Sequence, residues 1–247
     1  MRLFCLPHAG GSAGTYRRLL GNRMAGVRVT ALEPAGRGTR AHEPPHRTMR
    51  GTADDLSIRA ADVLAGDVLA GDDPDGYALL GHSLGALLAL EVAYRLTRRG
   101  RPAPRLLVVS GRNPPHLAPE ATDLHRADLS DEDLFARLVA LGGTTARASG
   151  PLIYRTFMPV LRADLALAGT YRPPADRRPL DCPLLVLYGR DDPLTSAAAL
   201  RQWHRYTSGP YRFRSLSGGH FFPMEHPRDF AAVVEEECAA LPGRRSR

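Results

Sequence analysis

Three residues far apart in the chain are of the types that perform covalent acyl chemistry. Ser83 lies in Gly-His-Ser-Leu-Gly, Asp192 in Gly-Arg-Asp-Asp-Pro and His220 in Gly-Gly-His-Phe-Phe. A serine hydroxyl is too weak an acid to attack a carbonyl unaided, but a histidine, with an ordinary pKa near ~6.5, can take its proton. A carboxylate can orient that histidine and stabilise it when it is charged. The residue types therefore predict a nucleophile, a general base and an orienting acid.

The residues around Ser83 match G-x-S-x-G, a pattern that alone also occurs in ordinary turns. The apolar residues 77–80 before it suit a buried strand, and the residues 84–96 after it are rich in Ala and Leu, as a helix requires. Ser83 is then predicted to lie at a sharp strand-to-helix turn. The backbone approaches closely there, so Gly81 and Gly85 must lack side chains.

A glycine-rich loop, residues 7–12, follows the apolar residues 2–6. Neither G-x-G-x-x-G nor the P-loop spacing is present, so a phosphate site is not expected in this loop. In hydrolases with a serine turn of this type, one oxyanion N–H comes from the residue after the serine and the second from such a loop. We therefore predict that the N–H groups of Leu84 and Ala9 form the oxyanion hole, with Gly10 as the next loop candidate.

Two neighbouring aspartates compete for the role of the acid. Asp192 is favoured because it precedes Pro193, which holds the residue before it in an extended conformation. Asp191 is expected to be a solvated or capping carboxylate. Parallel strands end at one edge of a sheet, so Ser83, Asp192 and His220 can meet there.

Strand and helix patterns alternate along the chain. Strand patterns cover residues 2–6, 27–32, 77–80, 105–109, 183–188 and 211–216, and helix patterns cover 52–69, 84–96, 195–206 and 226–241. The alternation predicts an α/β fold with a mostly parallel, twisted sheet of about six to seven strands and helices on both faces. The order serine, aspartate, histidine is that of α/β-hydrolases. We expect a single domain over residues 1–247.

The alternation is interrupted at about residues 112–173, where two or three short helices are predicted over residues 131–141 and 151–168. An insertion of this length after a strand end is typical of a helical lid. Its apolar residues are candidates to line an acyl-binding pocket, chiefly Leu134, Phe157, Met158 and Leu161. That these helix faces simply pack on the core is an equally good interpretation.

The composition excludes several classes of protein. The 247 residues carry a formal charge of +7, and all 33 basic residues are arginine. These arginines are scattered among acids and no nucleic-acid motif accompanies them, so nucleic-acid binding is not expected, whereas an acidic protein partner is left open. Arg37 and Arg40, in the loop after the second strand, either line an entrance or are paired structurally.

The cysteines and the apolar runs indicate the compartment. Only 3 cysteines occur, widely scattered, which argues against a disulfide framework and for the cytoplasm. No metal-ligand spacing is present, and no apolar run is long enough to span a membrane. We therefore expect no metal site and no membrane association.

Phrases along nearly the whole chain resemble those of type II thioesterases, the stand-alone editing enzymes of polyketide and non-ribosomal peptide assembly lines. They are LPHAGGSAGTY, PAGRGTR, GHSLGA, LRADLALAGTY, GRDDP and GGHFF. The resemblance implies hydrolysis of stalled or aberrant acyl thioesters on the phosphopantetheine arm of an acyl or peptidyl carrier protein, and Ser83, Asp192 and His220 match the family's triad. It implies no cofactor beyond the arm that the substrate carries. Carrier proteins are usually acidic, which suits the positive charge, and we expect a monomer.

Two other functions remain as alternatives. A general carboxylesterase or lipase would use the same three side chains, and only a comparison of substrates separates it from a thioesterase. A catalytically silent partner of a synthase is the third possibility, against which the complete set of Ser83, Asp192 and His220 argues.

Overall fold

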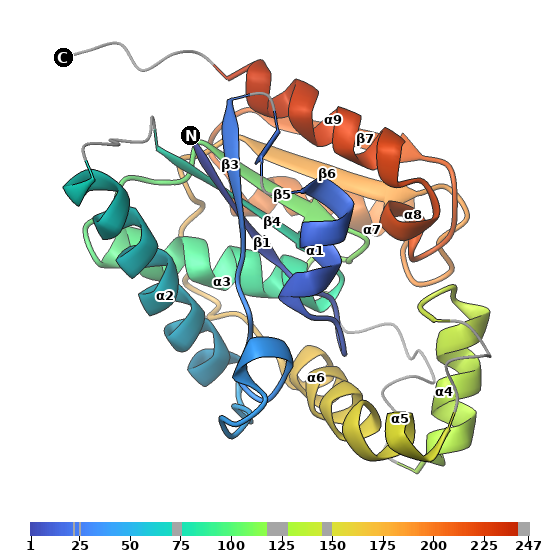
Figure 1. Cartoon of the computed structure of the whole chain (residues 1–247). Coiled ribbons are helices and arrows are strands. Elements are labelled where there is room, and N and C mark those ends of the chain that lie inside the picture. The colour runs from blue at the N-terminus through green and yellow to red at the C-terminus, as the bar shows by residue number, and fades with distance from the viewer. Residues whose placement is uncertain (22, 25, 71–75, 118–127, 145–149, 242–247) are drawn as a thin grey trace, which may run out of the picture.

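The centre of the fold is a sheet of 7 strands in the order β2-β3-β1-β4-β5-β6-β7 (Figure 1). The computed structural model describes residues 1–21, 23–24, 26–70, 76–117, 128–144 and 150–241. The strands are β1 (Arg2–Leu6), β2 (Arg23–Met24), β3 (Val27–Ala31), β4 (Tyr77–His82), β5 (Leu106–Ser110), β6 (Leu184–Gly189) and β7 (Tyr211–Leu216). Only β2 and β3 pair antiparallel, and the other neighbours pair parallel. The predicted mostly parallel sheet is confirmed.

Helices cover both faces of this sheet (Figure 1). The helices are α1 (Ala13–Leu20), α2 (Met49–Leu69), α3 (Leu84–Arg98), α4 (Asp131–Ala140), α5 (Pro151–Thr156), α6 (Met158–Thr170), α7 (Ala197–Arg201), α8 (Phe222–Glu225) and α9 (Pro227–Ala239), with the short 3-10 helices η1 (Gly38–Arg40) and η4 (Gln202–Tyr206). Successive side chains of a strand point to opposite faces, so Leu79 packs with α2 and α3 while Leu80 packs with α1 and α9. Every residue of β4 is buried, which fixes the strand before Ser83 at the centre of the sheet.

Helices α4, α5 and α6 lie in the predicted insertion at residues 112–173, of which 118–127 and 145–149 lie outside the described part of the chain. Figure 1 shows them beyond one edge of the sheet, where their apolar side chains form a cluster with Phe221. Two or three short helices were predicted in the insertion, and its described residues form three. The break between α5 and α6 falls next to Pro159, which has no N–H with which to continue the hydrogen bonding of α5.

Some elements differ from the sequence patterns. No element was predicted at α1 or β2, and α1 is a helix of 8 residues that contains Gly14. Packing of its buried Tyr16 and Leu20 against the α9 side of the core stabilises it more than its intrinsic propensity does. The helix predicted over residues 195–206 begins as α7 and ends as the tighter η4.

The three cysteines form no disulfide and belong to the packed core. Cys5, Cys182 and Cys238 are all buried and unpaired with one another, and burial raises the pKa of each thiol. They therefore stay protonated and unreactive. Among the residues that the structure describes, no helix has the length and apolar character that crossing a membrane requires.

Candidate active site

The turn at Ser83 has the strained geometry that the sequence predicts. Ser83 has φ 55° and ψ −117°, and it is the one non-glycine residue with positive φ in the described part of the chain. A Cβ added at Gly81 would collide with the carbonyl oxygen of Gly85, and one added at Gly85 would collide with that of Leu6. Both glycines are therefore required for the turn to form between β4 and α3.

His220 joins Ser83 to Asp192 by two hydrogen bonds. Its Nε2 lies 3.1 Å from Ser83 Oγ, and its Nδ1 lies 3.0 Å from Asp192 Oδ2. His220 and Asp192 are both buried. The three predicted side chains thus meet at the carboxyl edge of the sheet with the spacing that proton transfer from Ser83 to His220 requires. Their catalytic roles stay predictions.

Two packing features bring Asp192 rather than Asp191 to the histidine. A Cβ at Gly189 would collide with the carbonyl oxygen of Gly219, so the loops after β6 and β7 touch only because residue 189 has no side chain. The backbone N–H of Leu194 donates to Asp192 Oδ1 at 2.9 Å, which turns Oδ2 toward His220. The side chain of Asp191 is exposed to solvent. The geometry therefore favours Asp192 as the orienting acid.

Two further histidines, His82 and His8, lie beside His220, and the sequence predicted a catalytic role for neither, although it made His8 a candidate for the rim of the site. The His82 ring lies 5.1 Å from the His220 ring, and its Nδ1 lies 3.0 Å from Ser110 Oγ. Burial, followed by the nearby His220 and His8, lowers the pKa of His82 well below its ordinary value. Burial, with smaller effects from His220 and Arg37, lowers the pKa of His8 to about 4. Both rings are therefore uncharged near neutral pH and add no positive charge beside His220.

The structure distinguishes the two loop candidates for the oxyanion hole. The N–H of Gly10 donates to Asp164 Oδ2 at 2.8 Å, so it is not available to a substrate oxygen. In the part of the chain that the structure describes, neither the N–H of Ala9 nor that of Leu84 donates a hydrogen bond to another residue. Ala9 and Leu84 therefore remain the predicted donors.

Asp164 connects three parts of the site. It lies on α6, is 2% exposed, and accepts hydrogen bonds from Gly10 and from both terminal nitrogens of Arg37, with Arg37 Nη2 at 2.7 Å. Helix α6, the loop after β1 and the loop after β3 are thus held by one buried carboxylate. Arg40 is likewise buried and bonded to Glu43 and Asp55. Both Arg37 and Arg40 therefore form ion pairs within the fold, which supports the structural interpretation over the one in which they line the entrance to the site.

The predicted lid residues lie close to the oxyanion loop. Leu134, Met158 and Leu161 are buried, and Phe157 is half-buried in the same apolar cluster, which also contains Phe221 next to His220. A Cβ on Gly10 would lie 2.7 Å from the Phe157 ring. These side chains thus pack on one another as well as beside the site, and their contact with an acyl group stays a prediction.

We expect Asp164→Asn to lower kcat about 10- to 100-fold, because Gly10 and Arg37 lose the shared carboxylate and the oxyanion loop moves by a fraction of an ångström. The measurement is kcat and KM for an acyl thioester, at a temperature well below the thermal midpoint of the variant. A role limited to stability would lower the midpoint and leave kcat unchanged.

Asp131→Asn is the matched control for this experiment. Asp131 pairs with Arg162 at 2.6 Å and so also links two helices of the insertion, α4 and α6, but within the described residues it bonds neither to the loop after β1 nor to the triad. We expect its kcat to stay near that of the wild type. Equal losses in the two variants would show that Asp164 acts only on the stability of the lid.

The comparison with protein families decides which group of α/β proteins has this site. The model described as the thioesterase domain matches residues 1–238. The chain belongs to this family. Its fold is that of the α/β-hydrolases, and the members of the family hydrolyse thioesters.

Two similar relatives of this thioesterase are themselves named thioesterases and come from Streptomyces species. It is 39% identical to a probable cadicidin biosynthesis thioesterase of Streptomyces griseus over 98% of this chain, which spans 62% of that relative. It is 37% identical to the thioesterase PikA5 of Streptomyces venezuelae, over 98% of this chain and 83% of that protein.

Solved structures that are similar to this fold also include thioesterases. The RedJ thioesterase from the prodiginine biosynthetic pathway in Streptomyces coelicolor has a TM-score of 0.79 and 38% identity, over 96% of this chain and 85% of that one. The type II thioesterase BorB from the borrelidin biosynthetic cluster has a TM-score of 0.79 and 33% identity, over 95% of this chain and 91% of that one. ClbQ from the colibactin pathway has a TM-score of 0.86 and 30% identity, over 97% of each chain.

Proposed function

We propose that this thioesterase is a type II enzyme, which hydrolyses stalled or aberrant acyl thioesters from the phosphopantetheine arm of carrier proteins in polyketide or non-ribosomal peptide biosynthesis. The observation that carries the proposal is the hydrogen-bonded series Ser83, His220 and Asp192 at a strained turn. The substrate class is supported by two of the similar structures, ClbQ, which is named for the colibactin NRPS/PKS pathway, and BorB, which is named a type II thioesterase.

In the first step, the proton of Ser83 Oγ moves to His220 Nε2 while Oγ bonds to the thioester carbonyl carbon. The carbonyl oxygen becomes an oxyanion, for which we propose the N–H groups of Ala9 and Leu84 as donors, each worth about 3 kcal/mol. Asp192 accepts a hydrogen bond from His220 Nδ1 and stabilises the ring while it is charged. The C–S bond then breaks, and the leaving thiolate takes the proton from His220 Nε2.

In the second step, water attacks the ester that the acyl group forms with Ser83. His220 takes a proton from this water, and the oxyanion forms again next to the same two backbone N–H groups. The bond to Ser83 Oγ breaks, and Oγ recovers the proton from His220. The products are the free acid and the thiol of the carrier. The proposed reaction needs no cofactor of the enzyme, because a thiolate is a good leaving group.

Substrate comparison tests the proposal. One acyl group is offered as a carrier-protein thioester, as a coenzyme A thioester and as a p-nitrophenyl ester, and kcat/KM is measured for each. We expect the highest kcat/KM for the carrier thioester. Cleavage of the p-nitrophenyl ester as fast as the carrier thioester would instead indicate a general carboxylesterase.

A further inference from the structure

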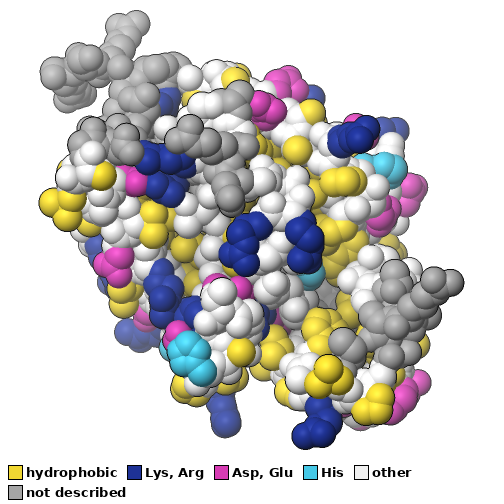
Figure 2. Space-filling model, viewed as in Figure 1, with side chains coloured by type: hydrophobic (Ala, Val, Ile, Leu, Met, Phe, Trp, Pro, Cys, Tyr) yellow, Lys and Arg dark blue, Asp and Glu magenta, His cyan; other side chains and the backbone are white. Residues whose placement is uncertain are grey.

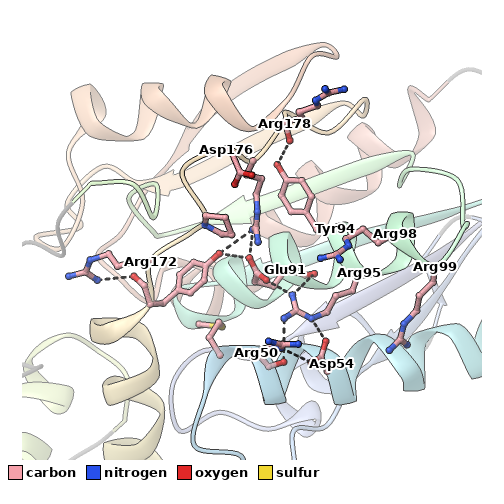
Figure 3. Close-up of a pocket in the computed structure, with 14 residues that line it drawn as sticks. Arg50, Asp54, Glu91, Tyr94, Arg95, Arg98, Arg99, Arg172, Asp176 and Arg178 are labelled. Carbon is pink, nitrogen blue, oxygen red and sulfur yellow. Dashed lines mark hydrogen bonds and ion pairs between the residues drawn. The ribbon is translucent and has the colours of Figure 1, made fainter.

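A groove of about 990 Å³ lies between the start of α2, the C-terminal half of α3 and the segment that follows α6 (Figure 3). None of the three triad residues lines it. Its lining includes seven arginines but only three carboxylates, so it is strongly basic. Nothing in the proposed reaction uses these arginines, and the groove therefore needs an explanation of its own.

The floor of the groove is a fixed network around one buried carboxylate. Glu91 on α3 accepts hydrogen bonds from Arg95, Arg177 and the hydroxyl of Tyr171. Burial alone would raise the pKa of Glu91, but the hydrogen bonds from these three side chains lower it, so the carboxylate stays ionised. The Arg177 guanidinium also lies over the Tyr94 ring at 4.2 Å from its centroid. The floor thus holds its arginines in place before any partner arrives.

The rim of the groove carries arginines that the fold does not use. Arg98, Arg99 and Arg178 are exposed, and within the described residues none of them forms an ion pair with a carboxylate. Figure 3 shows that Arg98 and Arg99 come from the end of α3 and Arg178 from the segment after α6. Basic residues at a helix C-terminus also compensate the helix dipole, but Arg178 lies outside any helix, so the dipole does not explain the rim as a whole.

The distribution of these charges indicates an acidic protein surface as the ligand. Arg98 and Arg99 lie at the end of α3 and Arg178 lies in the segment after α6, and Figure 3 shows that they do not converge on one point, as they would around a single phosphate. Carboxylates spread over a protein surface match such a rim, because each guanidinium can bind one of them bidentately. A single-stranded nucleic acid would need open aromatic faces, but Arg177 lies over the ring of Tyr94.

The groove is connected to the active site through the lid helix. Tyr171, at the C-terminal end of α6, bonds to Glu91 in the floor, while Asp164 on the same helix holds Gly10 beside the triad. We propose that the groove is the docking surface for the acidic face of the carrier protein. This inference rests on the proposed function, since that function supplies a carrier as the partner.

The test compares two charge reversals of equal size. R98E/R99E changes two adjacent exposed arginines in the groove, and R17E/R18E changes two adjacent exposed arginines at the end of α1, on the opposite side of the sheet. For each variant, KM is measured at low ionic strength for a carrier-bound acyl thioester and for the same acyl group on N-acetylcysteamine. We expect R98E/R99E to raise the KM for the carrier thioester, divided by the KM for the N-acetylcysteamine thioester, about tenfold. We expect R17E/R18E to leave this ratio near the wild-type value.

R178E provides an independent check from the other side of the groove, with an increase in the same ratio expected. The increase should shrink as salt is added, because exposed charges are screened. If the KM ratios of R98E/R99E and R178E are no higher than that of R17E/R18E, the groove is not the docking surface. Cleavage of the carrier thioester by the wild type would still support the proposed function. A wild-type protein that leaves the carrier thioester intact would overturn both. Loss of single-stranded DNA binding in R98E/R99E, with an unchanged KM ratio, would assign the groove to nucleic acid.

Discussion

Ser83→Ala is expected to abolish multiple turnover and to lower kcat by about 10⁶-fold, since removal of a nucleophile of this type costs that much in other hydrolases. Ser83 Oγ is the atom within hydrogen-bonding distance of His220 Nε2, at 3.1 Å, and without it no bond to the acyl carbon can form. The measurement combines single-turnover kinetics with the mass of the intact protein after an acid quench within the first turnover, before water releases the acyl group. We expect the wild type to gain the mass of the acyl group and Ser83→Ala to gain none.

A matched serine at the opposite edge of the sheet, Ser208, controls for the loss of a hydroxyl. Ser208 is exposed in the turn before β7, at the amino edge of the sheet, and its hydroxyl donates a long hydrogen bond of 3.4 Å to the Leu180 carbonyl, which the backbone N–H of Ser208 also contacts at 2.9 Å. We expect Ser208→Ala to keep both the turnover and the acyl adduct. An adduct that persists in Ser83→Ala would move the nucleophile to another residue.

The parts of the fold that follow from the sequence are those with strong local patterns. The strand before Ser83 and the helix after it are both buried and continuous, so their apolar residues already determined their type. The edge elements α1 and β2 gave no such pattern. Helix α1 is stabilised by packing on α9, which is distant in the chain, and local propensity does not reveal such a contact. Strand β2 has only 2 residues, too few to give a pattern.

The active site also contains residues that the sequence could predict and contacts that it could not. Ser83, Asp192 and His220 could be predicted because each follows a strand that ends at the same edge of the sheet. The contact between Gly10 and Asp164 could not be predicted, because it joins a loop to a helix 154 residues later. One signal was present, since Arg37 and Asp164 both lie in the phrases that resemble the thioesterase family, and the structure shows that they pair.

The largest effect expected after that of Ser83 is that of Asp192→Asn, which we expect to lower kcat by about 10⁴-fold. The Asp192 side chain has no exposed surface, and its Oδ1 is held by the N–H of Leu194 at 2.9 Å. An asparagine keeps its oxygen on that N–H, so its NH₂ group points at His220 Nδ1. A donor there moves the ring proton to Nε2, and His220 can then no longer accept the proton of Ser83.

Asp191→Asn is the control, because it makes the same chemical change one residue earlier, at an exposed side chain. We expect its kcat to stay within about twofold of the wild type, as for most surface substitutions. Thermal midpoints of both variants exclude unfolding as the cause of any loss, and kcat is measured for each with the same acyl thioester. A severe loss in Asp191→Asn with a mild one in Asp192→Asn would reverse the assignment. The acid that orients His220 in the reacting enzyme would then not be the one that lies 3.0 Å from its Nδ1.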